Sequence, residues 1–321
     1  MNDHAKPQVP ELSVVIVTPD DYRTIRTTVR FLLAQTVRER LEIVLVAPSR
    51  QELALEEAEL EPFCCHRVVE IGWVESLAAG NAAGVRQATA PVIALMEDHS
   101  RPHREWAQAV LEAHKGPWAA VGPVMGNPNP GSAVSWADFL LGFGTWWMPT
   151  EGGPIDHLPT HNASYRRDVL MQYDAELEDM LKAEIVLHWD LCARGHQLYL
   201  ESNARVHHVN FELLSSLLQV QFHAGRVFAA IRAHGWSPLK RMVYAAGSPL
   251  IPGVRLRYVL RQIARRGQLA ALPASVYPLL VLGLATSALG EMAGYSLGLG
   301  GASRSLGRFE FHRERHLRRR A

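Results

Sequence analysis

The sequence predicts an α/β protein with a mixed, mainly parallel sheet flanked by helices, followed by a helical C-terminal region. Short apolar runs alternate with longer amphipathic runs over the first third of the chain, as they do in βαβ units. Three of these runs, LSVVIV, LEIVLV and PVIALM, have the length and apolar character of buried strands. With 48% hydrophobic and 20% charged residues among 321, the chain is long and apolar enough for a large core, which excludes a disordered or fibrous protein.

The first half of the chain supplies the expected sheet and its helices. In order, we expect a strand at Leu12–Val17, a helix at Tyr22–Gln35, a strand at Leu41–Val46, an acidic helix at Arg50–Leu60, a small-residue helix packed close to the sheet at Glu75–Ala88, a strand at Pro91–Met96 and a helix at Pro102–His114. The Pro91–Met96 strand is apolar on both faces, so we expect it at the centre of the sheet. Its carboxyl end is where open α/β sheets bind ligands.

A long passage rich in Gly, Pro, Asn and Trp follows, from Gly122 to Leu170. Unstructured loops of this length are usually functional or disordered, and the tryptophans argue against disorder. A helix at Ile185–Arg194, stopped by Gly195, and a strand at Gln197–Leu200 complete the domain, which we expect to cover residues 10–212.

Residues 213–321 form a second, helical and Arg-rich region in this interpretation. An amphipathic helix is expected at Leu213–Ala233, and no charged residue occurs between Gly267 and Gly290, a span about long enough to cross a bilayer. The flanking arginines suit anionic headgroups. A membrane-contacting helix or hairpin, a hydrophobic oligomer contact and a buried core helix all remain open, because periodicity does not separate them.

Overall composition narrows the partners and the compartment. The 33 basic and 32 acidic residues nearly cancel, so no global charge indicates nucleic acid as a partner. Cys64, Cys65 and Cys192 are too few for a disulfide framework or a cysteine zinc site, which favours a reducing compartment. The first residues, MNDHAKPQVPELSVVIV, lack the pattern of a signal peptide, so we expect the catalytic part to stay in the cytosol.

Glu97, Asp98 and His99 follow the central strand and are the first candidate metal ligands. On an extended strand end, Glu97 and His99 would share one face while Asp98 points away. A carboxylate with an imidazole suits Mn²⁺ better than Mg²⁺, which prefers oxygen ligands. Alternatively, Asp98 or Ser100 caps the next helix and the other side chains are solvated.

Two further positions are chemically notable. His208 lies in ARVHHVN, after a short strand, where it either completes a metal site or is an ordinary satisfied imidazole. Glu184 opens a helical stretch, where the helix N-terminus stabilises the ionised carboxylate. From position alone, a helix-start charge is a better explanation of Glu184 than a catalyst.

Taken in order, four stretches resemble the inverting family 2 glycosyltransferases of GT-A fold, a Rossmann-like fold that binds nucleotide-diphospho-sugars. They are LSVVIVTPDDYRTIRTTVRFLLAQTVRERLEIVLVAPS, AAGNAAGVRQATAPVIALMEDHSRP, LPTHNASYRRDVL and AEIVLHWDLCARGHQLYLESNARVHHVN. The resemblance covers about residues 11–211. It implies the nucleotide pocket, the D-x-D motif, the acceptor-side segment and the segment that carries the base and a metal-binding His.

The resemblance also implies a role for each matching residue. Glu184 would be the catalytic base; donor binding would involve Thr18, Asp20, Asp21, Asn81, Glu97, Asp98 and, in the HAGR segment, Arg226; the acceptor side would include Asn162, Tyr165 and Arg166; and a divalent cation, Mn²⁺ or Mg²⁺, would bind Glu97, His99 and His208. The alternative for Arg226 is a solvated position, which is the more common one for an Arg on an amphipathic helix.

Three departures from the family pattern bear on these roles. D-x-D is replaced by Glu-Asp-His, the acidic pair at the base position is Ala183-Glu184, and the aspartates expected after the second strand are Ala47, Pro48 and Ser49. The last change leaves the identity of the nucleotide open. Asp20 and Asp21 would compensate, or they are turn residues before the following helix.

The resemblance implies an enzyme that moves a sugar, with inversion, from a nucleotide diphosphate sugar to a glycan or lipid-linked acceptor in polysaccharide or glycolipid synthesis. It would work at the cytoplasmic face of the cell membrane. A noncatalytic nucleotide-sugar-binding or scaffolding protein of the same fold is the alternative. A nucleotidyltransferase is disfavoured, because TPDDYR lacks the Gly-rich, Lys-bearing loop expected after its first strand.

Overall fold

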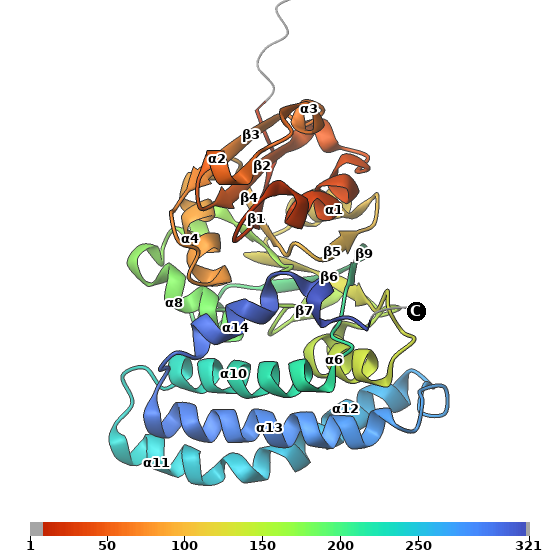
Figure 1. The fold of residues 1–321 in the computed structure, drawn as a ribbon, viewed down its shortest axis with the longest axis vertical. Coiled ribbons are helices and arrows are strands. Elements are labelled where there is room, and N and C mark those ends of the chain that lie inside the picture. Colours follow the sequence, from red (N-terminus) through yellow and green to blue (C-terminus); the bar gives the residue numbers. More distant parts are fainter. Residues whose placement is uncertain (1–8, 319–321) are drawn as a thin grey trace, which may run out of the picture. The chain divides into compact units, whose positions relative to one another are not determined.

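A mixed sheet with helices packed around it carries the first part of the chain and confirms the predicted α/β class (Figure 1). The computed structural model describes residues 9–318. Within these residues the sheet has nine strands in the order β3-β2-β1-β4-β8-β6-β9-β5, with β7 added to β9. The strands are β1 (Leu12–Val17), β2 (Leu41–Ala47), β3 (Cys65–Glu70), β4 (Val92–Met96), β5 (Ser100–Pro102), β6 (Ala120–Gly126), β7 (Gly153–Ile155), β8 (Ser164–Arg166) and β9 (Leu198–His208).

Helices connect these strands and form the C-terminal region. They are α1 (Tyr22–Leu33), α2 (Arg50–Leu53), α3 (Glu57–Leu60), α4 (Leu77–Gln87), α5 (Trp106–Ala113), α6 (Ala133–Phe143), α7 (Arg167–Leu170), α8 (Leu177–Lys182), α9 (Glu184–Ala193), α10 (Leu214–Arg232), α11 (Pro238–Gly247), α12 (Ile251–Arg265), α13 (Val276–Leu297) and α14 (Ala302–Glu310). Five single 3₁₀ turns are described as well: η1 (Arg38–Arg40), η2 (Gly144–Trp146), η3 (Asp174–Glu176), η4 (Ser248–Leu250) and η5 (Arg313–His316).

The parallel half of the sheet consists of β1 to β4, and its carboxyl ends share one edge. β1 pairs in parallel with both β2 and β4, and β2 pairs in parallel with β3. Every residue of β1, β2 and β4 is buried, and β4 lies between β1 and β8, which confirms the central strand that its apolar sequence predicts. The ends of these strands therefore bring Thr18 and Glu97 to the same edge.

Helix α4 packs unusually close to this half of the sheet because its contact face carries glycines. A Cβ added to Gly80 would lie 2.4 Å from Val17 Cγ1, and one added to Gly84 would lie 2.4 Å from Val15 Cγ1. The small-residue character of this helix is thus explained by packing against β1, as the sequence predicts.

The antiparallel half begins at β8, whose register on β4 is informative for the site. Val92 is paired with Arg166, and Ala94 with Ser164. Because β8 runs opposite to β4, the residues before Ser164 lie toward the carboxyl end of β4, and Arg166 lies at the other end of that strand.

Three expected elements differ in the structure. The prediction of one acidic helix at Arg50–Leu60 is wrong. The segment forms two short helices, α2 and α3, which are separated where Ala54 adopts a left-handed conformation with φ 47°. The expected helix at Pro102–His114 begins only at Trp106, because Ser100–Pro102 forms β5. Helix α5 has Glu105 as its N-cap residue, without a side-chain hydrogen bond, so the capping alternative for Asp98 and Ser100 is wrong.

Other elements are additions to the predicted set. β3 was not expected, because CHRVVE is only partly buried and carries charges. The passage from Gly122 to Leu170, read as a long loop, contains α6, β7, β8 and α7. β9 extends the expected strand at Gln197–Leu200 as far as His208. In the C-terminal region, α13 starts nine residues after Gly267 and continues past Glu291.

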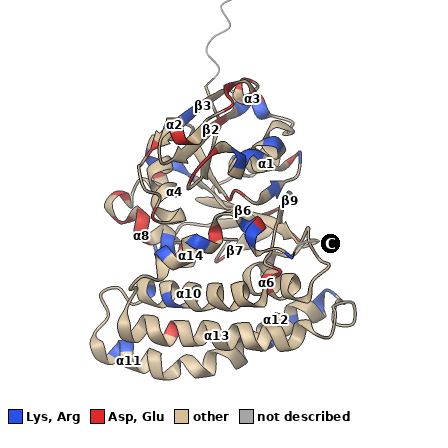
Figure 2. Cartoon of the chain, viewed as in Figure 1, with Lys and Arg blue, Asp and Glu red and all other residues tan. Residues whose placement is uncertain are grey.

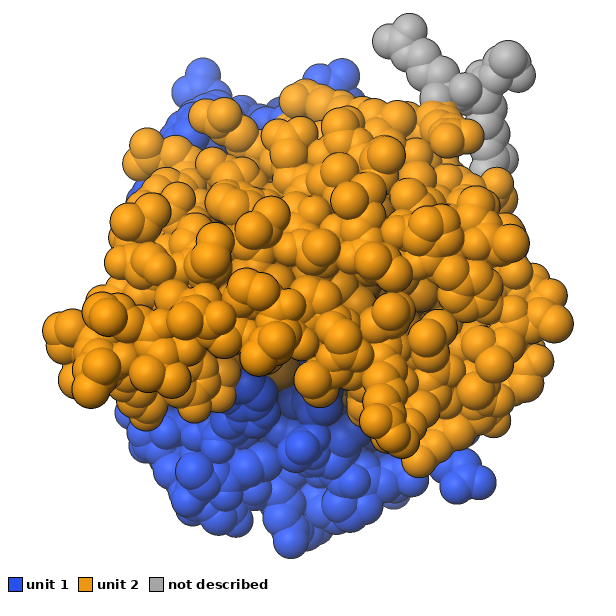
Figure 3. Space-filling view, turned by 90° about the horizontal axis from the view of Figure 1, so that it is seen from below, with its two compact units in different colours: residues 1–124, 149–181, 188–206 blue, residues 125–148, 182–187, 207–321 orange. Residues whose placement is uncertain are grey.

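The described chain forms two compact units, coloured separately in Figure 3. Unit 1 comprises residues 9–124, 149–181 and 188–206, and unit 2 comprises 125–148, 182–187 and 207–318. The sheet belongs to unit 1 except for the last residues of β6 and β9, which continue as unbroken strands into residues assigned to unit 2.

Helices α10 and α13 pack together at backbone contact inside unit 2. A Cβ on Gly290 would lie 2.0 Å from the carbonyl oxygen of Phe222, and one on Gly225 would lie 2.3 Å from that of Ser287. These glycines let two long helices approach more closely than other residues would permit. Helix α13 also contacts α6, α11 and α12, so it is the helix around which unit 2 is organised.

Replacing Gly290 by Ala should destabilise the protein, because the added methyl group meets the backbone of α10 rather than a movable side chain. We expect a loss of about 3 kcal/mol in the free energy of unfolding, measured by urea denaturation. Gly253→Ala is the matched control: it also lies in a helix, but its Cβ would have nothing within 4 Å. That change should be neutral or stabilising by up to about 1 kcal/mol. Equal effects of the two substitutions would contradict the close packing.

His114 should make the fold sensitive to acid. Burial, followed by the charge of Arg166, lowers the pKa of His114 to about 3, and its Nε2 lies 2.9 Å from Ser164 Oγ, which donates to the carbonyl of Val121. An unfolded His titrates near 6.5, so between pH 6.5 and 3 the unfolded state binds more protons and stability falls as the pH falls. We expect this His to account for about 2 kcal/mol of destabilisation between pH 8 and pH 5.

Urea denaturation of the wild type and of His114→Gln at both pH values tests this expectation. The variant should show a smaller loss of stability on acidification, whatever its stability at pH 8. An identical pH dependence in the two proteins would show that His114 is not the group responsible.

Candidate functional site

A tight turn after β4 builds the first part of the site. β4 ends at Met96, and the N–H of Ser100 donates to the carbonyl of Glu97 at 3.1 Å, so the chain reverses into β5. The Thr28 hydroxyl of α1 lies 2.7 Å from the carbonyl oxygen of Asp98 and ties this turn to the helix. Glu97 and His99 therefore come together through a turn, and the extended geometry expected from the sequence is wrong. His99 Nε2 lies 3.7 Å from Glu97 Oε1.

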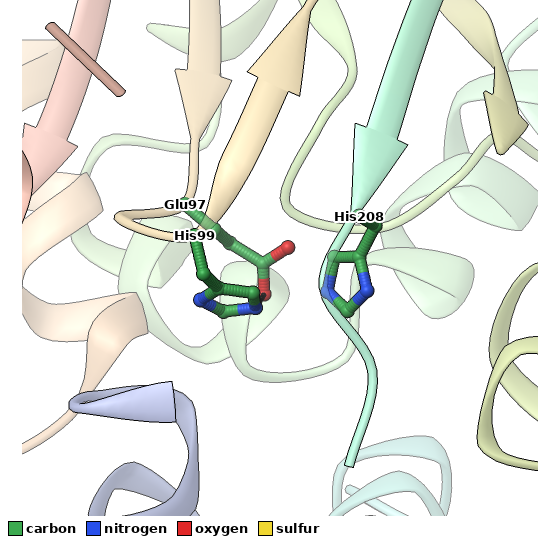
Figure 4. A group of neighbouring side chains, drawn as sticks. All are labelled: Glu97, His99 and His208. Atoms are coloured by element: carbon green, nitrogen blue, oxygen red, sulfur yellow. Dashed lines mark ion pairs between the residues drawn. The ribbon is translucent and has the colours of Figure 1, made fainter. Parts of the chain in front are cut away.

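His208 supplies the third member from the end of β9. One potential ligand atom from each of Glu97, His99 and His208 lies within 4.8 Å of the other two (Figure 4). The three side chains are 3%, 8% and 3% exposed, respectively. Buried carboxylates and imidazoles at this spacing are costly to desolvate without a partner, and a divalent cation is a suitable one.

Neighbouring side chains orient both imidazoles. His99 Nδ1 lies 2.5 Å from Asp98 Oδ1, and His208 Nδ1 lies 3.2 Å from Asn210 Oδ1. Because the Asp and Asn oxygens accept, we infer that each Nδ1 carries the proton and each Nε2 carries a lone pair. Ligating histidines commonly donate their second nitrogen in this way. The donor set, one carboxylate and two imidazoles, fits Mn²⁺ and other first-row divalent ions better than Mg²⁺.

Asn162 holds the carboxylate of this group. Its Nδ2 donates to Glu97 Oε2 at 2.8 Å, and its Oδ1 accepts from Ser100 Oγ at 2.5 Å. Asn162 is 1% exposed and lies two residues before β8, on the side where β4 ends. The structure thus brings one predicted acceptor-side residue into contact with a predicted metal ligand.

The residues that follow β1 form a hydrogen-bonded turn at the same edge of the sheet. Asp21 caps α1 by accepting from the N–H of Arg23, and the Arg23 guanidinium lowers the pKa of the Asp21 carboxyl. Asp20 Oδ1 lies 3.2 Å from Thr18 Oγ1 and 2.8 Å from Thr24 Oγ1. Both aspartates therefore have the turn role that the sequence left open, and neither position excludes a donor contact.

Asn81 is a different kind of candidate. It lies in α4, is 2% exposed, and its Oδ1 has no hydrogen-bond partner among the described residues. A buried amide oxygen without a donor is uncommon, so a ligand donor at this position would satisfy it.

Two of the predicted acceptor-side residues are not at the Glu97 end of β4. Tyr165 is fully buried, with its hydroxyl 2.8 Å from His188 Nε2. Arg166 pairs with Val92, and its guanidinium donates to the carbonyls of Trp118 and Gly116.

The remaining predicted residues lie on helices of unit 2. Glu184 is the first residue of α9 and is 1% exposed. Arg226 lies on α10, where its Nε donates to the carbonyl of Gly298 at 2.9 Å. Burial, followed by the charge of Arg226, lowers the pKa of the neighbouring His223. The catalytic role of Glu184 and the donor role of Arg226 stay predictions.

Sequence reasoning missed several residues that hold the site. Thr28 secures the turn, and Asn127 and Asn210 are joined by a hydrogen bond of 3.0 Å from Asn210 Nδ2 to Asn127 Oδ1. Asn210 lies two residues after His208, a position that could have drawn attention. Nothing local marks Thr28 or Asn127, since their partners are distant in sequence.

Comparison with known proteins places the chain in a family. The family model described as Glycosyl transferase family 2 matches residues 13–174, just over half of the 321 residues. A search of curated proteins found no match.

Solved structures match as well, among them one described as "Crystal structure of GalNAc-T7 with UDP, GalNAc and Mn2+". The identity is 17% and the TM-score 0.45, over 64% of this chain and 44% of that chain. The present chain therefore spans less than half the length of that protein. The family match, which covers the parallel half of the sheet, the turn after β4 and Asn162, is the result that identifies the chain: it belongs to glycosyl transferase family 2.

Proposed function

We propose that this protein is an inverting glycosyltransferase that moves a sugar from a nucleotide diphosphate sugar to an acceptor hydroxyl. The observation that carries the proposal is the buried group of Glu97, His99 and His208, beside the carboxyl ends of parallel strands. Family membership supplies the reaction class.

In this proposal Glu97, His99 and His208 would hold a divalent cation, Mn²⁺ rather than Mg²⁺, because two of the three ligand atoms are nitrogen. When bound, such an ion neutralises charge on the leaving nucleoside diphosphate. Asp98 and Asn210 keep the two imidazoles in the ligating tautomer, and Asn162 keeps the Glu97 carboxylate in place.

Nucleotide binding is assigned to the turn after β1 and to α4. Thr18, Asp20 and Asp21 would contact the nucleoside, and Asn81 would use its unsatisfied Oδ1 to accept a hydrogen bond from the donor. Arg226 would add positive charge beside the diphosphate. Since the acids expected after β2 are absent, the nucleobase stays unassigned.

Glu184 would be the catalytic base. Its carboxylate would take the proton from the acceptor hydroxyl as that oxygen bonds to the anomeric carbon. The bond from the anomeric carbon to the diphosphate oxygen would break on the opposite face, which inverts the configuration. Asn162 would lie on the acceptor side, and Tyr165 and Arg166 would support it by anchoring β8.

We place the reaction at the cytoplasmic face of the cell membrane, with a glycan or lipid-linked acceptor, in polysaccharide or glycolipid synthesis. Residues 10–212 would carry the transferase site and 213–321 the membrane-associating helices. Helix α13 supports this location, because its 22 residues are long and apolar enough to cross a bilayer. Core helices of soluble proteins can have the same length and composition.

A nucleotide-sugar-binding or scaffolding protein is the second candidate. It is favoured by the changes from D-x-D to Glu-Asp-His and from an acidic pair to Ala183-Glu184. Binding of a nucleotide diphosphate sugar with Mn²⁺ but without transfer or hydrolysis would support it, and no binding would contradict both candidates.

His208→Ala should weaken Mn²⁺ binding by about 100-fold or more, because the change removes a direct ligand rather than an outer partner. Isothermal titration calorimetry of Mn²⁺ into the full chain measures this affinity without donor or acceptor. His207→Ala is the matched control, since His207 precedes it on β9 and is not part of the three-residue group. If both variants bind Mn²⁺ like the wild type, the metal assignment is wrong.

Glu184→Gln should lower kcat by about 10²–10⁴-fold while donor affinity stays within a few-fold, because a general base acts in the transition state. The assay measures transfer from nucleotide diphosphate sugars, with donor affinity taken from calorimetry. Glu176→Gln, an exposed acid in η3, is the control and should leave kcat unchanged. A Glu184→Gln enzyme with wild-type kcat would remove Glu184 from the base role.

A further inference from the structure

An exposed apolar stripe runs along α11, η4 and the start of α12. Leu239, Met242, Val243, Leu250 and Val254 are 70%, 65%, 62%, 75% and 68% exposed, respectively. On α11, Met242 and Val243 lie three and four residues after Leu239, which places them on the same side of that helix. Val254 lies four residues after Leu250, at the start of α12. Isolated exposed apolar residues are ordinary, whereas a continuous stripe marks an interaction surface.

Basic residues continue the same stripe along α12. Arg257, Arg261 and Arg265 follow Val254 at helical spacing, are exposed and form no ion pair within residues 9–318. From residue 213 to residue 290 the sequence has nine Lys and Arg and no Asp or Glu. In Figure 2, the charged segments on α11 and α12 are blue, so the charge there is positive.

One face of helix α13, the span candidate, packs against other helices, while Val281, Leu282 and Leu289 on it are 48%, 42% and 53% exposed. Its Gly290 and Gly294 lie against the backbone of α10, where an added Cβ would be 2.0 and 2.4 Å from carbonyl oxygens. Its one acid, Glu291, is 2% exposed and 2.5 Å from Arg255 of α12. Burial raises the pKa of Glu291, although Arg255 opposes this shift. Crossing a bilayer as a single helix would break this packing.

We propose that α11, η4 and α12 bind in the plane of an anionic lipid bilayer, with α13 packed against α10, α11 and α12 rather than crossing the bilayer. The five apolar side chains would enter the interface between headgroups and acyl chains, and the three arginines would contact anionic headgroups. A second copy of the chain is a poorer occupant, because a symmetric contact through this face would bring two clusters of arginines together. The proposal deepens the membrane location given above by naming the surface and its orientation.

Co-sedimentation of the full chain with vesicles tests the proposal without donor, acceptor or metal, so it can fail while the transferase proposal stands. Binding should require phosphatidylglycerol in phosphatidylcholine vesicles and should weaken with added salt. The double variant Leu250→Glu and Val254→Glu should lose about tenfold or more in vesicle affinity. Arg257→Gln and Arg261→Gln should each lower the affinity for anionic vesicles about fivefold and leave the affinity for neutral vesicles unchanged.

Val9→Glu is the matched control, because Val9 and Leu250 are both 75% exposed and Val9 lies outside the stripe. Circular dichroism and thermal unfolding establish that each variant is folded. Wild-type affinity in the Leu250→Glu and Val254→Glu protein, or loss in Val9→Glu alone, would overturn the proposal. The proposal would also be overturned by two results together: the wild type does not bind vesicles, and sedimentation velocity shows a wild-type dimer that is absent in the double variant.

Alkaline carbonate extraction of membranes from expressing cells separates in-plane binding from a span. The protein should be released, as interfacial proteins are. Retention in the carbonate-washed membranes would show that α13 crosses the bilayer and would overturn the in-plane arrangement.

Discussion

The turn that closes after Met96 is the constraint on which the site depends. It places a carboxylate and an imidazole, Glu97 and His99, side by side in a region where both are nearly inaccessible to water. Buried polar groups of this kind need partners: Thr28 bonds the carbonyl oxygens of the turn, Asn162 donates to one oxygen of the Glu97 carboxylate, and Asp98 bonds Nδ1 of His99. The bond to Asp98 leaves Nε2 of His99 available to a cation. The same hydrogen bonds thus stabilise the turn and orient its ligands.

The sequence predicts this part of the protein well because the signal is local. A strand that is apolar on both faces belongs in the middle of a sheet, and polar residues directly after it belong at a ligand-binding edge. What it does not predict are contacts between distant segments, such as Thr28 with the turn 70 residues later and Asn127 with Asn210. No periodicity encodes them. The break between α2 and α3 at Ala54 was not predicted for a related reason. Acidic residues with helical preference continue on both sides, and only the left-handed conformation of Ala54 shows that the helix ends there.

Unit 2 shows where hydropathy alone is ambiguous. Helix α13 is apolar around its whole circumference, which suits a bilayer and a protein core equally. The glycines show that one face of α13 meets the backbone of α10 at Gly290, a contact that occurs between helices in bilayers as well as in protein cores. The neighbouring α12 is less apolar and would rank lower in any hydropathy window, yet it carries the exposed residues Leu250 and Val254 at or near its start. A search for long apolar runs therefore points to α13, whereas the most exposed apolar side chains of this region, Leu297 apart, lie on α11, η4 and α12.

The replacement of D-x-D by Glu-Asp-His changes the charge as well as the ligand chemistry. Two aspartates would give a bound cation two negative charges, whereas Glu97 with His99 and His208 as neutral ligands would give it one. A divalent ion held by this set would keep more of its positive charge for the diphosphate. Nitrogen ligands also shift preference away from Mg²⁺ toward later first-row ions. Asp98, bonded to His99 Nδ1, returns part of the lost negative charge without occupying a ligand position. The variant motif is therefore chemically coherent as a metal site in its own right, with the middle residue acting through the third.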